Sequence, residues 1–300
     1  MRTLPSFTTT RTLRLLAAPL VVAAGVAVAP AVTTADGETP ITCGTVVTAD
    51  VRLRADLVDC AGAGLVIGAP GITVDLAGHV IDGTGSATGI DNSAGHDDIR
   101  ITRGTIRDFQ FGIHLFETSG ARVDRLTVES NIIGAIIERS TATELDRVTA
   151  TSSDGMGIEI TFSEGITVRR STVAANGLYG IFDIASIGSR YERNTITGNA
   201  GSGLALWQSD QVVVERNHAA GNDTHGIDLT GVASAVVERN EAIANGEHGI
   251  FIDQPGTTVV RNRAIANQGI GIAAPAGTID GGRNTATGNL GGDCTSVACR

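Results

Sequence analysis

A repeat of about 23 residues runs through most of the chain and restricts the folds that it can adopt. A glycine followed by a small or branched apolar residue recurs in steps of 22 or 23 residues, at Gly89, Gly112, Gly134, Gly157, Gly180, Gly203, Gly226 and Gly249. Two asparagine columns keep nearly the same period, one at Asn176, Asn199, Asn222, Asn245, Asn267 and Asn289 and one at Asn194, Asn217, Asn240 and Asn262. Columns that share one period are typical of a solenoid, in which neighbouring repeats complete each other's core.

Each repeat contains short alternating segments that are typical of β-strands. In 227–229 and 250–252, two aliphatic residues flank one residue that points to the opposite side. Residues 212–214 form a second short apolar segment, and Gly, Asn, Asp and Ser separate such segments. A helical period is absent. We therefore predict an all-β parallel solenoid of about nine or ten coils, each with two or three strands stacked about 4.8 Å apart.

The polar columns fit the turns of such a solenoid. Asparagine tolerates a left-handed backbone, and its amide can bond to the asparagine of the next coil. An arginine column from Arg125 to Arg261 includes the residue before each member of the second asparagine column, and Glu192, Glu215 and Glu238 precede three of its members. We interpret it as an exposed ladder of ion pairs, with binding of glycan acids as the alternative.

The sequence resembles the right-handed parallel β-helix repeat proteins of the pectate-lyase-like superfamily. The segment CGTVVTADVRLRADLVDCAGAGLVIGAPGITVDLAGHVIDG, which starts at Cys43, is similar to the opening coil of secreted members, and the pair Asp293 and Cys294 is similar to their end. The resemblance covers roughly residues 41–300 and implies a right-handed helix. It implies no single activity, because the superfamily includes polysaccharide lyases, glycoside hydrolases, alginate epimerases, copper-site maturation factors and surface proteins.

The two ends of a solenoid expose strand edges, which need covers. We predict an N-terminal cap at residues 41–63 and a C-terminal cap at residues 284–300, within one β-helix domain over residues 36–300.

The first 35 residues have the pattern of a secretory signal peptide. Arg2, Arg11 and Arg14 precede an apolar run from Leu15 to Ala29, and small residues follow it. The run is short for a membrane span. We predict removal of residues 1–35, an extracellular location and no membrane span in the mature chain, with an uncleaved anchor as the alternative.

Four cysteines lie in two pairs near the ends of the mature chain, Cys43 with Cys60 and Cys294 with Cys299. An even number of cysteines in a secreted chain predicts disulfides, and three connectivities are open. The two local bridges are favoured because the ends of a long solenoid lie far apart. A zinc site is the alternative, although the spacing fits no standard ligand set.

The charge excludes one class of partner. The chain has no lysine, and its formal charge of −10 becomes about −13 when Arg2, Arg11 and Arg14 are removed (32 acids against 19 arginines). An acidic surface without a basic stripe repels nucleic-acid phosphates. We predict no nucleic-acid partner, no cofactor and no metal site.

Unusual residues gather at equivalent places of adjacent coils and form the candidate site. His225 and His248 are 23 residues apart, and Tyr179 holds the same place earlier in the chain. Asp228 and Glu159 each stand between two aliphatic residues and are expected to point outward. The predicted catalytic residues are His225, His248, Asp228 and Glu159, as acids, bases or their partners. The predicted substrate-binding residues are Trp207, Tyr179 and Asp253, with Trp207 as a stacking surface for sugar rings.

The leading functional hypothesis is a secreted β-helix that binds an extracellular polysaccharide, with lyase or glycosidase activity as its enzymatic form. Signatures of several enzyme families are absent, including the Asp-Pro-His-Asp motif of alginate epimerases, and the pair Asp97 and Asp98 is the only trace of the polygalacturonase set. A non-catalytic structural or surface-interaction solenoid is therefore the alternative. A metal-handling factor is a third hypothesis that rests on the resemblance alone.

The histidine pair gives the sharpest geometric expectation. If the register holds, His225 and His248 lie on neighbouring strands about 4.8 Å apart. A structural ladder predicts two stacked rings. A working site predicts one ring bonded to a carboxylate, beside a cleft that reaches Trp207.

Overall fold

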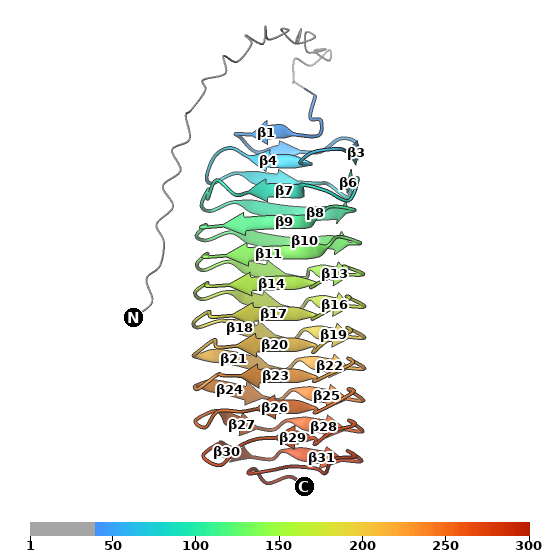
Figure 1. Ribbon diagram of the computed structural model, residues 1–300. Helices are drawn as coiled ribbons and strands as arrows, with labels where there is room; N and C mark the ends of the chain where they lie inside the picture. The colour runs from blue at the N-terminus through green and yellow to red at the C-terminus, as the bar shows by residue number, and fades with distance from the viewer. Residues whose placement is uncertain (1–39) are drawn as a thin grey trace, which may run out of the picture. The chain divides into compact units, whose positions relative to one another are not determined.

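The computed structural model describes residues 40–300, in which parallel β-strands stack into a column (Figure 1). Every regular element of this range is a strand, and residues 41–300 form one compact unit. The predicted all-β parallel solenoid is confirmed. The predicted signal peptide, residues 1–35, lies outside the described residues.

One face of the column is an eleven-stranded parallel sheet, which we call the front sheet. Each of its strands pairs in register with the equivalent strand of the next coil, as Leu204 does with Ile227. Its strands in spatial order are β1 (Thr45–Val47), β4 (Leu65–Ile67), β7 (Thr88–Asn92), β9 (Phe111–Phe116), β11 (Ile133–Glu138), β14 (Ile158–Thr161), β17 (Ile181–Ile184), β20 (Leu204–Trp207), β23 (Ile227–Thr230), β26 (Ile250–Ile252) and β29 (Ile272–Ala273).

Two further columns of strands, the second and third sheets, complete each coil. The long strands β8 (Arg100–Arg107) and β10 (Arg122–Glu129) run through both columns. The other strands of the second sheet are β2 (Val51–Arg52), β5 (Thr73–Asp75), β12 (Glu144–Asp146), β15 (Thr167–Arg169), β18 (Arg190–Glu192), β21 (Val212–Glu215), β24 (Ala235–Glu238), β27 (Thr258–Val260) and β30 (Ile279–Gly282). The other strands of the third sheet are β3 (Leu57–Cys60), β6 (Val80–Gly83), β13 (Thr149–Thr151), β16 (Thr172–Ala174), β19 (Thr195–Thr197), β22 (His218–Ala220), β25 (Glu241–Ile243), β28 (Arg263–Ile265) and β31 (Thr285–Thr287).

The eleven front strands give eleven turns, slightly more than the repeat count predicts. The first turns break the period. Thr45 pairs with Leu65, twenty residues later (65 − 45), and Leu65 pairs with Ile90, 25 residues later (90 − 65). Because these steps differ from 23, the first turns do not stand out as members of the repeat.

Aliphatic side chains fill the interior between the three sheets. Ile158, Ile181, Leu204, Ile227 and Ile250 stack along the front sheet, and each is 0% exposed. Each is followed by one outward residue and then by a second inward position. The alternation seen in the sequence therefore separates the core from the outer face of the front sheet.

Two ladders of buried asparagine hold successive coils together. In the first, the Nδ2 of Asn199 donates to the Oδ1 of Asn222 at 2.9 Å, and Asn222 donates to Asn245 at 3.0 Å. In the second, Asn194 donates to Asn217 at 3.0 Å. The predicted bonding between asparagines of successive coils is thus observed.

The predicted left-handed backbone lies one residue earlier than expected. Arg193, which precedes Asn194, has φ 55°, and Ala175, which precedes Asn176, also has φ 55°. The asparagine side chain turns inward to bond to the next coil. The residue before it makes the bend, and an exposed side chain such as arginine occupies this strained position.

A third ladder, of serine, was not predicted. The backbone N–H of Ser140 donates to the hydroxyl of Ser163, that of Ser163 to Ser186 and that of Ser186 to Ser209, each at 3.1 Å. All four residues are buried. This ladder lies at the turn between the front and second sheets, so each of the three corners has an internal polar column in part of the helix.

The repeating glycine is required by close approach between coils. A Cβ on Gly226 would lie 2.6 Å from the carbonyl oxygen of Gly249 and 2.7 Å from the Nδ2 of Asn245. Any side chain would therefore push the next coil and the asparagine ladder away, which explains why a glycine column accompanies the asparagine column.

Both predicted disulfides are present. Cys43 pairs with Cys60 at a Cα separation of 5.5 Å, and Cys294 pairs with Cys299 at 6.1 Å. Residues 41–63 contain β1, β2 and β3, and hence the first turn of the helix. The role of this segment and of residues 284–300 as caps stays a prediction.

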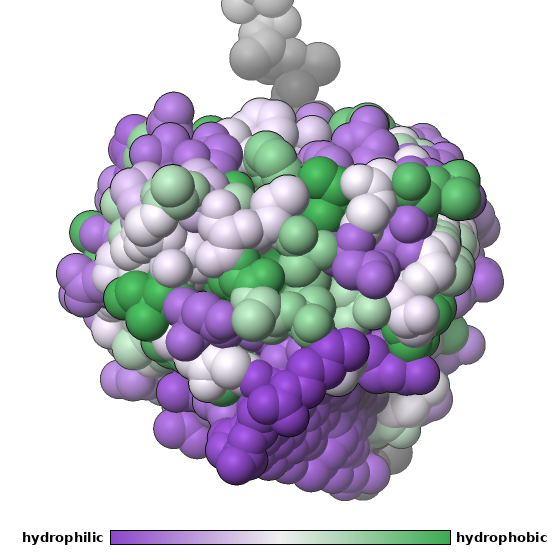
Figure 2. Space-filling model, turned by 90° about the horizontal axis from the view of Figure 1, so that it is seen from below, coloured by the Kyte–Doolittle hydropathy of each residue, from purple (hydrophilic) through white to green (hydrophobic). Residues whose placement is uncertain are grey.

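The flanks of the column differ in polarity. Seen along its axis from the C-terminal end, the molecule has one strongly hydrophilic flank that recedes along the column (Figure 2). On the second sheet, Arg216 pairs with Glu215 at 2.7 Å and Arg239 pairs with Glu238 at 2.8 Å, as the predicted ladder requires. Within residues 40–300 we find no helix long and apolar enough to span a membrane.

Candidate functional site

One row of outward residues on the front sheet, with one residue from each strand, contains the candidate site. Strand register places these residues side by side, one from each coil. From β7 to β29 the row consists of Asp91, His114, Ile136, Glu159, Phe182, Ala205, Asp228, Phe251 and Ala273. Glu159 and Asp228 thus point outward, as the alternation predicts.

Aromatic residues concentrate on this outer face. The chain has only ten aromatic residues, counting Phe, Tyr and Trp. Six of them lie on the outer face of the front sheet, at Phe111, Phe116, Tyr179, Phe182, Trp207 and Phe251. Such a concentration exceeds what the fold needs, because the narrow core is filled by aliphatic residues.

Tyr179, Phe182 and Trp207 form a cluster that we call the aromatic platform. The rings of Tyr179 and Phe182 are stacked with centroids 5.2 Å apart, and Trp207 meets both edge-on at 5.8 and 5.3 Å. Ala205 points outward between Phe182 and Asp228 and yet is 0% exposed. The aromatic platform and the side chains next to it therefore cover the apolar side chain of Ala205.

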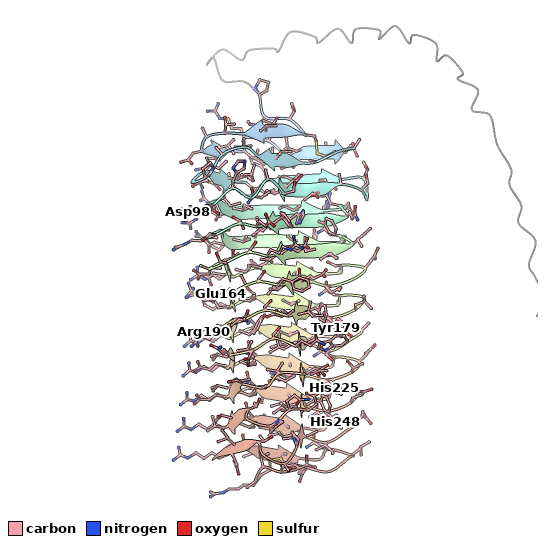
Figure 3. All side chains as sticks on the ribbon, turned by 60° about the vertical axis from the view of Figure 1, so that its left-hand side comes forward. Asp98, Glu164, Tyr179, Arg190, His225 and His248 are labelled. Atoms are coloured by element: carbon pink, nitrogen blue, oxygen red, sulfur yellow. A yellow bond between two sulfur atoms is a disulfide. The ribbon has the colours of Figure 1, made fainter. Side chains whose placement is uncertain are left out.

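His225, His248 and Phe251 form a second cluster, the ring stack. The two imidazoles lie 5.2 Å apart with an interplanar angle of 10°, and Phe251 stacks on both at 4.9 and 5.5 Å. Figure 3 shows His225 and His248 on the same side of the column as Tyr179, opposite Arg190 and Glu164. The stacked arrangement is the one expected for a ladder.

Backbone contacts fix the tautomer of both histidines. The N–H of His248 donates to the Nδ1 of His225 at 3.2 Å, and the N–H of Ile270 donates to the Nδ1 of His248 at 2.8 Å. An Nδ1 that accepts cannot carry a proton, so each neutral ring has its hydrogen on Nε2. Protonation of either ring would break its backbone hydrogen bond.

His225 also contacts a carboxylate, as expected for a working site. Its Nε2 lies 3.3 Å from Glu247. Burial lowers the pKa of His225, and the charges of Asp228 and Glu247 oppose this effect. The stacked rings expected for a structural ladder and the carboxylate contact expected for a working site are thus both present.

Asp228 is held by two donors. The indole N–H of Trp207 donates to its Oδ2 at 3.3 Å, and the hydroxyl of Thr230 donates to its Oδ1 at 2.7 Å. Asp228 is 5% exposed, and burial raises its pKa against the effect of these donors. Because both oxygens are engaged, Asp228 is arranged to orient Trp207.

Asp253 and Tyr179 lie at the two edges of this group. The Oδ1 of Asp253 accepts the N–H of Gly231 at 2.7 Å, which ties Asp253 to the preceding coil. Burial raises the pKa of the Tyr179 phenol, and the charge of Asp228 adds to the effect. The structure thus brings together Tyr179, Trp207, His225, Asp228, His248 and Asp253 on one face.

Glu159 is the one predicted site residue that lies apart from this group. It is three strands from Asp228, or about 14 Å along the axis at about 4.8 Å per strand. Glu159 is partly buried and makes no hydrogen bond or ion pair within the described residues. Burial raises its pKa, and the charge of Glu138 on the neighbouring strand adds to this.

Phe182 in the aromatic platform and Phe251 in the ring stack were not predicted from the sequence. They occupy the same outward column as Asp228 and Glu159, and reading every member of that column would have found them.

A buried polar group beneath the platform was also missed. Asp183 is 0% exposed and points into the core between Ile160 and Leu206. It accepts hydrogen bonds from the hydroxyl of Tyr191 and, at 3.2 Å, from that of Ser209. Burial raises the pKa of Asp183 against the effect of these donors. It replaces an aliphatic residue of the repeat and is fully inside the helix.

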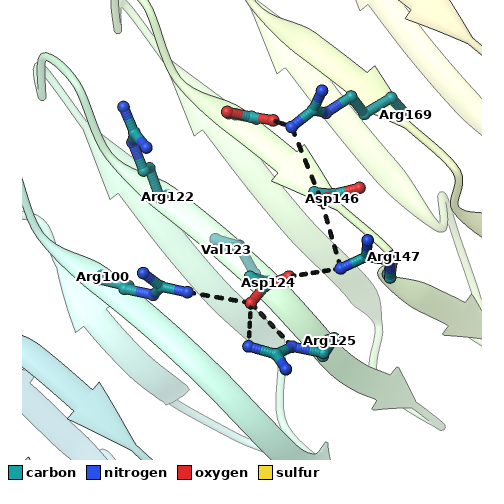
Figure 4. A pocket seen from close by; sticks show the side chains of 9 residues that line it. Arg100, Arg122, Val123, Asp124, Arg125, Asp146, Arg147 and Arg169 are labelled. Carbon is teal, nitrogen blue, oxygen red and sulfur yellow. Dashed lines mark hydrogen bonds and ion pairs between the residues drawn. The ribbon is translucent and has the colours of Figure 1, made fainter.

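A hollow of about 300 Å³ lies on the second sheet, away from the aromatic residues (Figure 4). Asp124 lies within it, 2.7 Å from Arg125 and 3.1 Å from Arg100. Burial alone would raise the pKa of Asp124, but these arginines lower it. Its carboxylate is thus occupied by ion pairs. Within residues 40–300, no three His, Cys, Asp or Glu side chains are grouped so that they could hold a metal ion.

Comparisons with solved structures agree with the fold. A double mutant of the periplasmic alginate epimerase AlgG is 16% identical, with a TM-score of 0.56 over 84% of this chain and 73% of that one. Pectate lyase Pel9A is 16% identical, with a TM-score of 0.52 over 74% and 72%. The Dettilon tailspike protein is 15% identical, with a TM-score of 0.55 over 86% of this chain and 61% of the tailspike. At such low identities the likeness shows the fold alone.

A comparison with curated proteins finds no match. A family model described as the right-handed β-helix region matches residues 133–290, which is more than half of the chain. The resemblance read from the repeat is thereby confirmed, and the chain belongs to the right-handed β-helix family.

Proposed function

We propose that this protein binds a polysaccharide chain along the front sheet, across the aromatic platform and the ring stack. The observation that carries the proposal is the gathering of six of the ten aromatic residues on one outer face. A protein that served only as a spacer would have no need for aromatic residues on one face. The names of two structural relatives, an alginate epimerase and a pectate lyase, support a polysaccharide as the ligand.

The platform has the features that recognise sugar rings. The C–H groups of a pyranose pack against aromatic rings, while its hydroxyls need polar partners at the rim. Trp207 is partly exposed and is fixed by its bond to Asp228, so little side-chain entropy is lost on binding. Tyr179 offers a hydroxyl beside its ring, and Asp253 and Glu247 supply acceptors.

The charges of this face favour a glycan without acidic groups. Between β17 and β26 the outward positions of the front sheet contain no arginine, and the chain has no lysine. Asp228, Asp253 and Glu247 lie there instead. A polymer of uronic acids would meet carboxylates with no cation to pair with, which is unfavourable. We therefore propose an uncharged polysaccharide.

For His225, His248 and Asp228 we propose a positioning role in place of the predicted catalytic one. The Nδ1 of each histidine and both oxygens of Asp228 have partners within the protein. These contacts support a positioning role, in which the three residues shape the binding face. The same contacts favour the second candidate function, a solenoid that binds its ligand without turning it over.

The predicted signal peptide and the two disulfides support a location outside the cytoplasm. An extracellular polysaccharide would then be within reach. We propose secretion on this basis, and detection of the mature chain in the culture medium would test it.

A glycan array followed by calorimetry would test binding. We expect Trp207→Ala to weaken affinity for the bound glycan at least tenfold, or about 1.4 kcal/mol. Val236→Ala is the matched control, because Val236 is an exposed apolar residue on β24 of the second sheet. Equal binding by the Trp207→Ala variant and the parent would contradict the proposed face.

Chemically matched polymers would test the charge argument. Reduction of the carboxyl groups of a polyuronate gives a neutral polymer with the same linkages. We expect the neutral member of a pair to bind and the acidic member to bind more weakly, with the difference shrinking at high salt. Tighter binding of the acidic member would refute the charge argument and leave the binding face in place.

A further inference from the structure

The hollow on the second sheet is lined by more cations than anions, in a protein that is acidic overall. Five arginines line it against three carboxylates, and the arginines are Arg100, Arg122, Arg125, Arg147 and Arg169 (Figure 4). The hollow therefore has an excess of two positive charges, whereas the whole chain has a formal charge of −10. Such a local excess attracts anions.

The aspartates of the hollow are already engaged by arginine. Asp124 accepts hydrogen bonds from Arg100 at 3.1 Å and from Arg125 at 2.9 Å. Asp146 accepts one from the Nε of Arg170, on the next coil, at 2.7 Å. The two aspartate side chains are only 13% and 12% exposed, so these ion pairs fix the surrounding arginines before a ligand arrives.

Three arginines of the hollow keep hydrogen-bond donors that have no partner in the protein. Arg122 makes no hydrogen bond or ion pair within residues 40–300, and no dashed line reaches it in Figure 4. Arg147 lies 3.7 Å from Asp124 and 3.8 Å from Asp146, which is beyond hydrogen-bond distance. The Nε of Arg169 is buried and has no hydrogen-bond partner among the described residues. Three successive coils thus offer guanidinium donors to a ligand.

Strand register explains why Arg122 is unpaired. It lies on β10 between Arg100 on β8 and Glu144 on β12. Glu144, which lines the hollow as its third carboxylate, pairs with Arg169. Arg122 therefore has a like charge on one side and a carboxylate that is already engaged on the other.

An interruption of the acidic column at Arg169 produces the excess of arginine. On the next three coils a glutamate precedes each arginine of the ladder, as Glu192 precedes Arg193 at 2.7 Å. Arg169 occupies the register position that Asp146 and Glu192 hold on the neighbouring strands. Arg170 consequently has no acid before it and bonds to Asp146 of the preceding coil. The arginine that follows Asp146 is left without a close partner.

We propose that this hollow is a second binding site, which takes a phosphate monoester carried by a sugar. A phosphate monoester has a charge of about −1.5 to −2 at pH 7 and three acceptor oxygens. These match the excess of two positive charges and the three arginines with open donors. The planar fork of a guanidinium suits phosphate geometry, and the hydrogen bonds that it makes are charge-assisted.

The size and the lining of the hollow favour a sugar phosphate. Its volume of about 300 Å³ falls within the range of about 300–1,000 Å³ that small-molecule sites occupy. The remaining lone pairs of Asp124 and Asp146 can accept hydrogen bonds from sugar hydroxyls. No aromatic ring lines the hollow within residues 40–300, so a nucleobase would have no ring on which to stack.

This site is independent of the polysaccharide face on the front sheet. The two surfaces belong to different sheets, and the hollow contains none of the rings of the aromatic platform or the ring stack. Loss of Trp207 should therefore leave phosphate binding unchanged, and loss of Arg122 should leave polysaccharide binding unchanged.

Calorimetry on the full mature chain at low salt would test the ligand, with glucose 6-phosphate, inorganic phosphate, glucose 6-sulfate and glucose as probes. We expect glucose 6-phosphate to bind most tightly and glucose not to bind. Inorganic phosphate lacks the sugar, and the sulfate ester has a single charge, so both should bind more weakly. Added salt should weaken the binding of all three anions.

Arg122→Ala tests the hollow itself, because Arg122 makes no contact whose loss would disturb the fold. We expect it to weaken glucose 6-phosphate binding at least tenfold, and Arg122→Lys to give an intermediate loss, since lysine keeps the charge without the fork. Arg283→Ala is the matched control. Arg283 is an exposed arginine that also lacks a partner within residues 40–300, and it follows β30, seven strand steps or about 34 Å from β10.

Three results would overturn the proposal. The first is that neither phosphate binds, and the second is that Arg122→Ala binds as tightly as the parent or that Arg283→Ala loses as much affinity. The third is that inorganic phosphate or the sulfate ester binds as tightly as glucose 6-phosphate, which would exclude the sugar phosphate as the ligand. Circular dichroism would confirm that each variant is folded.

Discussion

At the scale of single residues, the most unusual is Asp183, a carboxyl group inside the apolar core. Its raised pKa means that the folded state favours its protonated form. The stability that it contributes is present below the ordinary aspartate pKa of about 3.9 and is lost as the pH rises through the higher folded value. Replacing it by asparagine keeps an acceptor for Tyr191 and removes the charge.

We therefore expect Asp183→Asn to stabilise the protein relative to the parent at pH 7, with the difference vanishing as the pH falls towards 3. Urea unfolding at several pH values would measure it. Tyr191→Phe is the companion variant, because it removes the donor and leaves Asp183 buried, and it should cost about 1–3 kcal/mol. A constant difference between parent and Asp183→Asn at all pH values would contradict this account.

Trp207 is the only tryptophan of the chain, so its fluorescence reports on the platform alone. The indole N–H of Trp207 donates a hydrogen bond to Asp228, and burial raises the pKa of this carboxyl group. We expect its emission to change with pH above the ordinary aspartate range, as Asp228 gains its proton and weakens as an acceptor. Asp228→Asn should flatten this transition. A transition that persists in this variant would have to come from His225, whose pKa is lowered.

At the scale of elements, the asparagine ladder explains why the coils keep one length. Asn222 accepts two hydrogen bonds from Asn199 and donates to Asn245 and to the carbonyl of Ile196. We expect Asn222→Ala to cost about 2–4 kcal/mol, since it leaves buried groups without partners. Chemical unfolding would measure the loss. Asp223→Ala, at the exposed neighbouring position, is the control and should change stability by less than about 0.5 kcal/mol.

The regular elements could be predicted well from the sequence, because successive coils repeat the same packing and hydrogen-bonding requirements. Glycine contacts and inward aliphatic residues recur in most coils, and asparagine bonding recurs in the coils around the candidate site, so the register of Asp228, His225 and His248 could be counted from the sequence. The serine ladder and the left-handed backbone of Arg193 were missed. Serine is common at turns in general, so its presence there does not reveal a ladder, and arginine has no preference for a left-handed backbone.

At the scale of the whole molecule, the disulfides close loops of different length near the ends of the helix. Cys43 and Cys60 are 17 residues apart, and Cys294 and Cys299 are 5 apart. Loop-closure entropy predicts a contribution of about 3 kcal/mol for the first bridge and less for the second. Replacing Cys43 and Cys60 by serine should therefore lower the urea midpoint more than replacing Cys294 and Cys299. The reverse order would show that loop length does not govern the effect.

The constant spacing of the front strands fixes the length of the binding face and hence the length of a linear ligand that can contact all of it. The binding rings extend from β17 to β26, three steps of about 4.8 Å, or about 14 Å. A disaccharide would touch the platform or the ring stack, whereas a longer oligomer would reach both. Affinity should therefore climb with the degree of polymerisation and level off once the oligomer exceeds this span, so that the helix selects chains by length as well as by composition.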